Sequence, residues 1–133
     1  MKRALPRGDQ RHRTGAHAEA WAQRFLEAHG LVLVERNFRC RDGELDLVML
    51  DGRELVIVEV RCRTSDALVR PEITVSATKR RRLLRAAARY LQLHPAFADH
   101  AVRFDVLGLT GQPDRPHCEW IRCAFTTDDV GCC

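Results

Sequence analysis

Residues 43 to 62 read GELDLVMLDGRELVIVEVRC and predict a β-hairpin at the centre of the fold. Two segments, Glu44 to Leu50 and Glu54 to Cys62, show the alternation that is typical of strands. Between them, Asp51-Gly52 is a strong signal for a tight turn. Asp46 lies inside the first segment, although aspartate is depleted from strand interiors, so its presence needs a reason.

The register of this hairpin decides which side chains meet. Glu59 and Arg61 are two residues apart and therefore point to the same face of their strand. A loop at Gly52-Arg53 places Asp46 directly opposite Glu59, whereas a loop at Asp51-Gly52 places Asp46 diagonal to Glu59. Both registers put the two acids and the arginine on one face, while a three-residue loop would separate them.

Two carboxylates on neighbouring strands repel each other and need compensation. A divalent cation supplies it, because Mg²⁺ binds one or two carboxylates and keeps its other positions for water and phosphate oxygens. Arg61 beside Asp46 and Glu59 could hold a phosphate oxygen. This set of groups is suited to phosphodiester hydrolysis. The alternative is a solvated strand face on which Arg61 only neutralises both acids.

The segments around the hairpin predict an α/β fold. Thr14 is a capping residue for a helix that runs to about His29, with Glu19 at the edge of its apolar stripe. This stripe consists of Ala18, Trp21, Ala22, Phe25 and Leu26. A strand is expected at Leu31 to Phe38. The first part of the domain is therefore a helix followed by three strands.

The second half predicts another helix and two further strands. The helix spans Ser76 to Leu93, and the strands span Ala101 to Leu109 and Cys118 to Phe125. The expected order is α-β-β-β-α-β-β, with a central mixed sheet of about five strands. The helix has an apolar stripe of Leu84, Ala87, Ala88 and Leu91 and a basic stripe of Arg82, Arg85 and Arg89.

Composition favours a single soluble domain. The chain has 133 residues, a net charge of +4 and six cysteines that match no zinc-binding pattern. We expect a disordered basic arm at residues 1–13, a domain at 14–125 and an irregular tail at 126–133. The charged start lacks the apolar run of a signal peptide, and no segment is long and apolar enough for a membrane. We therefore expect a cytoplasmic protein with reduced thiols.

Short motifs, taken in order from Gly15 to Phe125, resemble those of the YraN family, a widespread set of small bacterial proteins. They are Gly15-x-x-Ala18-Glu19, Arg36-Asn37, Gly43-Glu44-Leu45-Asp46-Leu47, Val58-Glu59-Val60-Arg61-x-Arg63, Lys79, Arg103-Phe104-Asp105-Val106 and Ala124-Phe125. The individual motifs are short, but their order and spacing make the resemblance specific.

The resemblance implies a restriction-endonuclease-like PD-(D/E)xK fold, similar to archaeal Holliday-junction resolvases. It implies a catalytic site in which Glu19, Asp46 and Glu59 bind Mg²⁺ or Mn²⁺. The expected substrate is a nucleic acid, most readily DNA in branched or single-stranded form. Resolvases of similar fold act as two-fold dimers, so a homodimer is one open expectation.

One position departs from the family pattern. The lysine of the family's ExK triplet is replaced by Arg61, and arginine stays protonated and cannot act as a base. Lys79 is the only lysine outside the amino-terminal arm, and two roles are open for it: that of the missing lysine, or contact with a phosphate or solvent. Arg63, Arg82, Arg85 and Arg89 are the candidate nucleic-acid contacts.

Three functions remain open at this point. The leading hypothesis is a metal-dependent endonuclease-like hydrolase. The second is a nucleic-acid-binding module that has kept the fold and lost cleavage, which the arginine in the ExK position favours. The third is a protein-interaction domain, for which no sequence feature argues. Asp105 is expected to have a structural role.

Overall fold

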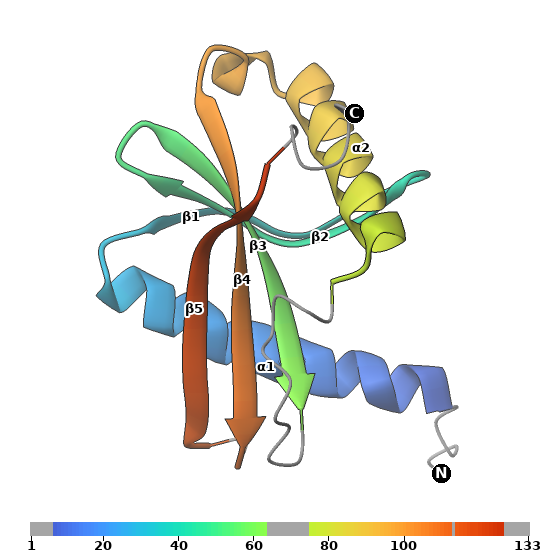
Figure 1. Ribbon diagram of the computed structural model, residues 1–133, viewed down its shortest axis with the longest axis vertical. Coiled ribbons are helices and arrows are strands. Elements are labelled where there is room, and N and C mark those ends of the chain that lie inside the picture. The colour runs from blue at the N-terminus through green and yellow to red at the C-terminus, as the bar shows by residue number, and fades with distance from the viewer. Residues whose placement is uncertain (1–6, 64–74, 113, 127–133) are drawn as a thin grey trace, which may run out of the picture.

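The computed structural model describes residues 7–63, 75–112 and 114–126 and confirms the predicted order of elements (Figure 1). Side chains are described from residue 17 onward, except at residue 63. The elements are α1 (Arg7–Ala28), β1 (Val32–Cys40), β2 (Gly43–Asp51), β3 (Glu54–Arg63), α2 (Ala77–Leu93), the short 3-10 helix η2 (Pro95–Phe97), β4 (Ala101–Gly111) and β5 (Pro116–Phe125).

The five strands form one mixed sheet in the order β1-β2-β3-β4-β5. Only β3 and β4 are parallel, and α2 lies in the connection between them, as parallel neighbours require a crossover. The other three pairs are antiparallel. Helices α1 and α2 cover opposite faces of the sheet (Figure 1), so the molecule has three layers. The predicted α/β class is confirmed, and the architecture is consistent with a restriction-endonuclease-like fold.

Alternation along β3 divides its side chains between two apolar cores. Leu55 and Ile57 pack toward α2 in a cluster with Leu83 and Tyr90. Val56 and Val58 pack toward α1 in a cluster that includes Ala18, Ala22 and Leu26. Since side chains alternate along a strand, Glu59 and Arg61 belong to the face that α2 covers.

The hairpin has the first of the two registers expected from the sequence. Its turn is Gly52-Arg53, and Leu47 pairs with Val58 and Leu50 with Leu55. The β2–β3 ladder ends at Leu47, before Asp46 reaches its partner position. Beyond this point β2 stays paired with β1 and runs away from β3 (Figure 1). The sheet therefore forks at Asp46.

A break in the alternation of the β1–β2 ribbon accompanies the fork. Leu45 and Val48 lie in the same core although they are three residues apart in one strand. The pairs on either side of the break are Arg36 with Leu47 and Phe38 with Leu45, which places Asn37 across from Asp46. Asn37 has φ 57°, in the left-handed region that asparagine tolerates better than most residues. The ribbon thus rotates at the candidate site.

Two helix expectations need correction. Helix α1 begins at Arg7, so Thr14 does not cap it; arginine and glutamine in the preceding segment have good helix propensity. Residues 1–6 of the expected arm and 127–133 of the expected tail lie outside the described residues. In α2 the expected stripe is wrong at Ala88, which is exposed. The buried residues are Leu83, Ala86, Ala87 and Tyr90, while Leu84 and Leu91 are only partly buried at the edge.

Candidate functional site

Three carboxylates from three different elements meet where β2 leaves β3. Glu19 comes from α1, Asp46 from β2 and Glu59 from β3. Glu19 and Glu59 are buried, with 8% and 4% of their surfaces exposed. Asp46 is close to both, since Asp46 and Glu19 affect each other's pKa and the charge of Asp46 acts on Glu59. The structure therefore brings together the three acids that the sequence singled out.

At the fork, the side chain of Asp46 accepts a backbone hydrogen bond from β3. Its Oδ2 accepts a hydrogen bond of 2.9 Å from the backbone N–H of Val60. A backbone donor that loses its strand partner must find another acceptor. This bond explains how an aspartate is accommodated within a strand, and it fixes the carboxylate at the end of the ladder.

Glu19 reaches the same place from the opposite layer. Its carboxyl group lies within reach of the side chain of Asn37, the residue in the left-handed conformation. The neighbouring Arg36 donates to Gln23 of α1 over 3.0 Å, which ties the helix to β1. Asn37 was not among the predicted site residues, although the Arg36-Asn37 pair was one of the short motifs that could have indicated it.

Two cations converge on one oxygen of Glu59. The guanidinium of Arg61 lies 3.4 Å from Glu59 Oε2, and the ammonium of Lys79 on α2 lies 3.5 Å from the same atom. Glu59 Oε1 and Glu19 Oε1 are buried and have no hydrogen-bond partner in the described part of the chain. Because an unpaired buried polar atom is costly, these two oxygens are available acceptors for a bound cation.

Burial and mutual repulsion raise the pKa values of the acids. Burial, followed by the charge of Asp46, raises the pKa of Glu59 to about 7. Burial is also the main reason that the pKa of Asp46 rises to about 7, with a smaller contribution from the nearby Glu19. The pKa of Glu19 is raised, again chiefly by burial. Such shifts are typical of sites where carboxylates await a cation or a proton.

The donor set fits a hard divalent cation. Carboxylate oxygens are the ligands that Mg²⁺ and Mn²⁺ prefer. Within the described residues, no three acidic, histidine or cysteine side chains are already arranged as a metal cage. Mg²⁺ does not need one, since it commonly binds through one or two carboxylates and retains several waters. Asp46 and Glu59 are two such carboxylates, since the charge of Asp46 acts on Glu59 and Glu59 Oε1 has no partner among the described residues.

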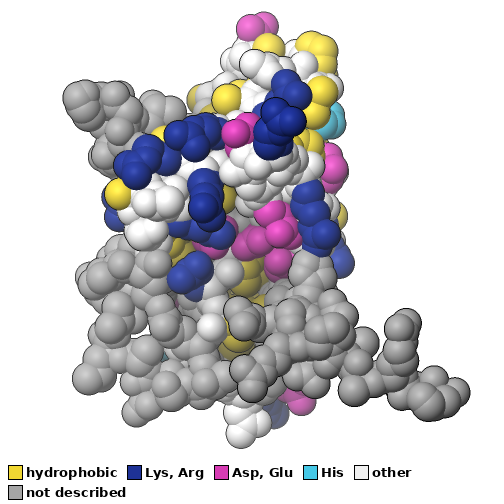
Figure 2. Space-filling view, turned by 90° about the vertical axis from the view of Figure 1, so that its right-hand side faces the viewer, with side chains coloured by type: hydrophobic (Ala, Val, Ile, Leu, Met, Phe, Trp, Pro, Cys, Tyr) yellow, Lys and Arg dark blue, Asp and Glu magenta, His cyan; other side chains and the backbone are white. Residues whose placement is uncertain are grey.

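Basic side chains border the acidic site. Figure 2 shows acidic side chains in the middle of one face, with lysine and arginine side chains on both sides of them. Arg82, Arg85 and Arg89 of the predicted stripe are all exposed, but only Arg82 lines the pocket next to Lys79. Strand β3 ends at Arg63, whose side chain lies outside the described residues.

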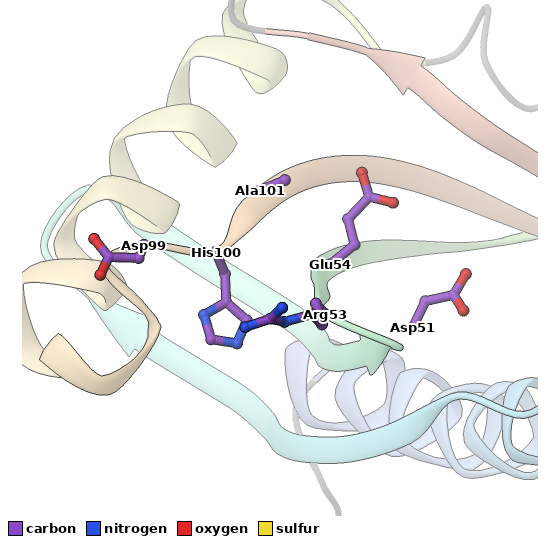
Figure 3. A pocket seen from close by; sticks show the side chains of 6 residues that line it. All are labelled: Asp51, Arg53, Glu54, Asp99, His100 and Ala101. Carbon is purple, nitrogen blue, oxygen red and sulfur yellow. The ribbon is translucent and has the colours of Figure 1, made fainter.

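A larger pocket of about 530 Å³ lies at the other end of the sheet. Figure 3 shows it between the β2–β3 turn and the segment that leads into β4. Two of its acids, Asp51 and Glu54, form ion pairs of 3.0 and 2.9 Å with Arg103. These acids are neutralised within the fold, and on β3 the lining of the pocket ends at Glu54, five residues before Glu59. It is therefore separate from the carboxylate site.

Asp105 has the structural role expected from the sequence. It is fully buried and accepts hydrogen bonds from Arg103, from the indole N–H of Trp120 and from the backbone N–H of Cys123. The last two bonds are both 2.9 Å and attach β5 to β4. A carboxylate with this many donors has no need of a metal ion.

Comparison with known proteins identifies the family. The sequence model of the uncharacterised protein family UPF0102 matches residues 18–109, which include all three acids and Lys79.

None of the helices in the described ranges is long and apolar enough to cross a membrane.

Curated relatives match over nearly their whole length. A UPF0102 protein of Xanthomonas oryzae pv. oryzae (strain PXO99A) is 48% identical over 119 residues, covering 90% of this chain and 96% of the relative. Another from Stutzerimonas stutzeri (strain A1501) is 46% identical over 112 residues, covering 84% and 93%. A third from Marinobacter nauticus is 44% identical over 115 residues, covering 86% and 93%. The chain therefore belongs to the UPF0102 family, which is the YraN family that its motifs predicted.

Proposed function

We propose that this protein is a metal-dependent nuclease that hydrolyses phosphodiester bonds in DNA. The observation that carries the proposal is the meeting of Glu19, Asp46 and Glu59 at the fork of the sheet, with Lys79 and Arg61 beside them. Acids buried together at a cost to the fold, with unpartnered oxygens, are typical of a binding site and not of a structural core.

Each side chain has a role in this proposal. Glu19, Asp46 and Glu59 would hold Mg²⁺ or Mn²⁺ through their oxygens. The bound cation would lower the pKa of a coordinated water and stabilise charge on the phosphate. Arg61 and Lys79, which lie on the same oxygen of Glu59, would contact the non-bridging oxygens of the scissile phosphate. The two cations differ in shape: the guanidinium of Arg61 is a planar fork, whereas the ammonium of Lys79 is a compact point charge.

Cleavage assays test this proposal directly. Labelled four-way-junction, single-stranded and duplex DNA are incubated with the wild-type protein in Mg²⁺, Mn²⁺ or EDTA. We expect cleavage that requires the metal and is abolished by Asp46→Asn, which preserves the shape of the side chain. Glu27→Gln is the matched control, because it removes an exposed carboxylate from α1 that lies eight residues, or about 12 Å of helix, from Glu19. Metal-independent cleavage, or equal cleavage by Asp46→Asn, would contradict the proposal.

A second candidate function is a nucleic-acid-binding module that does not cleave. The observation that favours it is Arg61, which occupies the ExK lysine position and is already engaged with Glu59. This module would bind DNA and divalent metal but leave every substrate intact. Arg61→Lys then becomes the informative variant, since a gain of cleavage would show that the site lacks only a suitable base.

Localisation and assembly follow from the same proposal. We propose a cytoplasmic protein, in keeping with the free thiols of Cys40, Cys62, Cys118 and Cys123 in the described residues. A homodimer is proposed only for a junction-cleaving activity, because two symmetric cuts need two sites. Light scattering with and without junction DNA measures the assembly state, and a monomer on the junction would exclude paired cleavage.

A further inference from the structure

A pocket of about 330 Å³ lies beside the carboxylate site, between the β1–β2 turn and the first turns of α2. The strands contribute Arg39 and Glu44, and the helix contributes Lys79 and Arg82, above the apolar side chain of Leu83. The two elements are in close contact here, since a Cβ atom at position 43 would lie 3.5 Å from the backbone oxygen of Arg82. The pocket is thus part of the packed structure.

Charge in this pocket is unbalanced. Three cations, Arg39, Lys79 and Arg82, face one acid, Glu44. The ion pair between Arg39 and Glu44 is 3.5 Å long, and 57% and 36% of the two side chains are exposed, so this pair contributes little to stability. Arg82 has no ion pair or side-chain hydrogen bond with any residue that the structure describes. An anion that enters the pocket would find an unengaged guanidinium.

Lys79 belongs to both the pocket and the carboxylate site. It lines the pocket, and its ammonium lies 3.5 Å from Glu59 Oε2. A phosphate in the pocket would therefore lie next to a phosphate at the carboxylates. The volume is at the lower end of the range of about 300–1,000 Å³ for small-ligand pockets, which suits one phosphate with its sugar. The β1–β2 turn and α2 form walls on two sides of the pocket.

We propose that this pocket binds, on an unpaired nucleic-acid strand, the phosphate adjacent to the one that is cleaved. The inference rests on the proposed function and adds to it the form of the substrate. Arg82 and Arg39 hold the phosphate oxygens from opposite walls, as the planar guanidinium fork does well. Lys79 lies between the two phosphates. The path therefore crosses from α2 to the β1–β2 turn and does not follow the helix along Arg85 and Arg89.

Two arginines distinguish this path from a stripe along the helix. Arg39 belongs to the pocket and not to the stripe, whereas Arg85 belongs to the stripe and does not line the pocket. Arg81→Ala is the matched control, because Arg81 is exposed on α2, outside the pocket, and its guanidinium contacts Thr78. Each of these substitutions with alanine removes one positive charge from the surface, so net charge alone cannot separate them.

The experiment measures binding of a labelled single-stranded DNA oligonucleotide by fluorescence anisotropy in EDTA, over a series of salt concentrations. We expect Arg82→Ala and Arg39→Ala each to reduce the salt slope of log K by about 0.7, the value for one lost phosphate contact on a single strand. Arg85→Ala and Arg81→Ala should leave the slope unchanged. The proposal would be overturned if Arg82→Ala and Arg85→Ala both reduced the salt slope while Arg39→Ala left it unchanged.

Two further binding measurements distinguish a single-strand site from a site for free anions and from a site for duplex DNA. Inorganic phosphate at matched ionic strength should not displace the oligonucleotide; displacement that Arg82→Ala abolishes would identify a site for free anions instead. A matched duplex should bind with no effect of Arg39→Ala, and an equal effect on duplex would exclude the single-strand assignment. The binding assay does not require cleavage. If Arg82→Ala and Arg39→Ala have the expected effects on binding but the protein cleaves no DNA, only the proposed nuclease activity is contradicted. A wild-type protein that binds no DNA would contradict both.

Discussion

The ammonium of Lys79 and the guanidinium of Arg61 lie 3.5 and 3.4 Å from the same oxygen of Glu59. One cation comes from α2 and the other from β3, so the carboxylate is approached from two layers of the fold. Lys79 is 40% exposed and remains accessible to a substrate, whereas Arg61 is 29% exposed. The geometry supports the hypothesis that a lysine from the helix serves where the strand carries arginine.

Lys79→Ala should lower metal-dependent DNA cleavage by about 10²–10³-fold, the usual effect of removing one group that stabilises the transition state. Lys79→Arg keeps the positive charge but replaces a compact ammonium with a planar guanidinium, so this variant should bind DNA as the wild type does and recover little cleavage. The measurement is single-turnover cleavage at saturating protein. Recovery of activity in Lys79→Ala/Arg61→Lys would show that the two positions are interchangeable, while full activity of Lys79→Ala would remove Lys79 from the site.

Glu59→Gln should stabilise the metal-free protein at pH 8. Burial raises the pKa of Glu59 from 4.5 to about 7, so the folded state keeps a proton that the unfolded state loses. The free energy of unfolding therefore falls as pH rises from about 4.5 to 7 and stays low above it. Glutamine has no charge to bury. Urea unfolding in EDTA should show a gain of about 1–3 kcal/mol at pH 8 and little difference at pH 4.5.

A gain in the free energy of unfolding on Glu59→Gln is expected only where the fold disfavours the charged carboxylate. If Glu59→Gln were less stable than the wild type at both pH values, Glu59 would be a structural ion-pair partner of Lys79 and Arg61. Glu27→Gln provides the comparison, because its exposed carboxylate should change stability by no more than about 0.5 kcal/mol at either pH.

The amount of this site that sequence could predict depends on the length scale of each feature. Residues two apart in a strand share a face by geometry, so the contact of Glu59 with Arg61 followed from their spacing. The hairpin turn at Gly52-Arg53 was one of two registers that local signals allowed. The fork at Asp46 was not predictable, because it depends on the backbone conformation of Asn37 and on a helix from another layer.

Helix faces show the same limit. The stripe on α1 was predicted correctly, since Ala18, Ala22 and Leu26 are strongly periodic and buried. On α2, Leu84 competes with Leu83 for the core, and the run of alanines fits either choice. Tertiary packing selects Leu83 and Tyr90 because Tyr90 fills space against Phe38, with ring centroids 4.9 Å apart. Periodicity predicts the buried face of a helix to within about one residue, and packing against the sheet determines which residues are buried.

Divalent metal should stabilise the protein more at pH 8 than at pH 6. Binding requires deprotonated carboxylates, and the pKa values of Asp46 and Glu59 are both raised to about 7, so protons compete with the metal at the lower pH. Thermal unfolding with Mn²⁺ or Mg²⁺ should show a larger rise in Tm at pH 8, and calorimetry in two buffers should detect proton release. Glu19→Gln should weaken the effect and Glu27→Gln should not. An equal rise in all variants would indicate nonspecific binding.

Removal of the Asp105 carboxylate should change stability in the opposite direction from neutralisation of Glu59, although both carboxylates are buried. Asp105 accepts hydrogen bonds from Arg103, Trp120 and the backbone of Cys123, so its charge is fully compensated. Asp105→Ala leaves the mostly buried Arg103 and the Trp120 N–H without this partner, and breaking a buried pair in this way costs about 3–5 kcal/mol. Urea unfolding at pH 8 should therefore show a large loss for Asp105→Ala where Glu59→Gln shows a gain. The contrast separates an acid that the fold needs from acids that the fold tolerates for their chemistry. If both substitutions destabilised the protein equally, the carboxylates at the fork would be structural, and the proposal of a metal site would lose its physical basis.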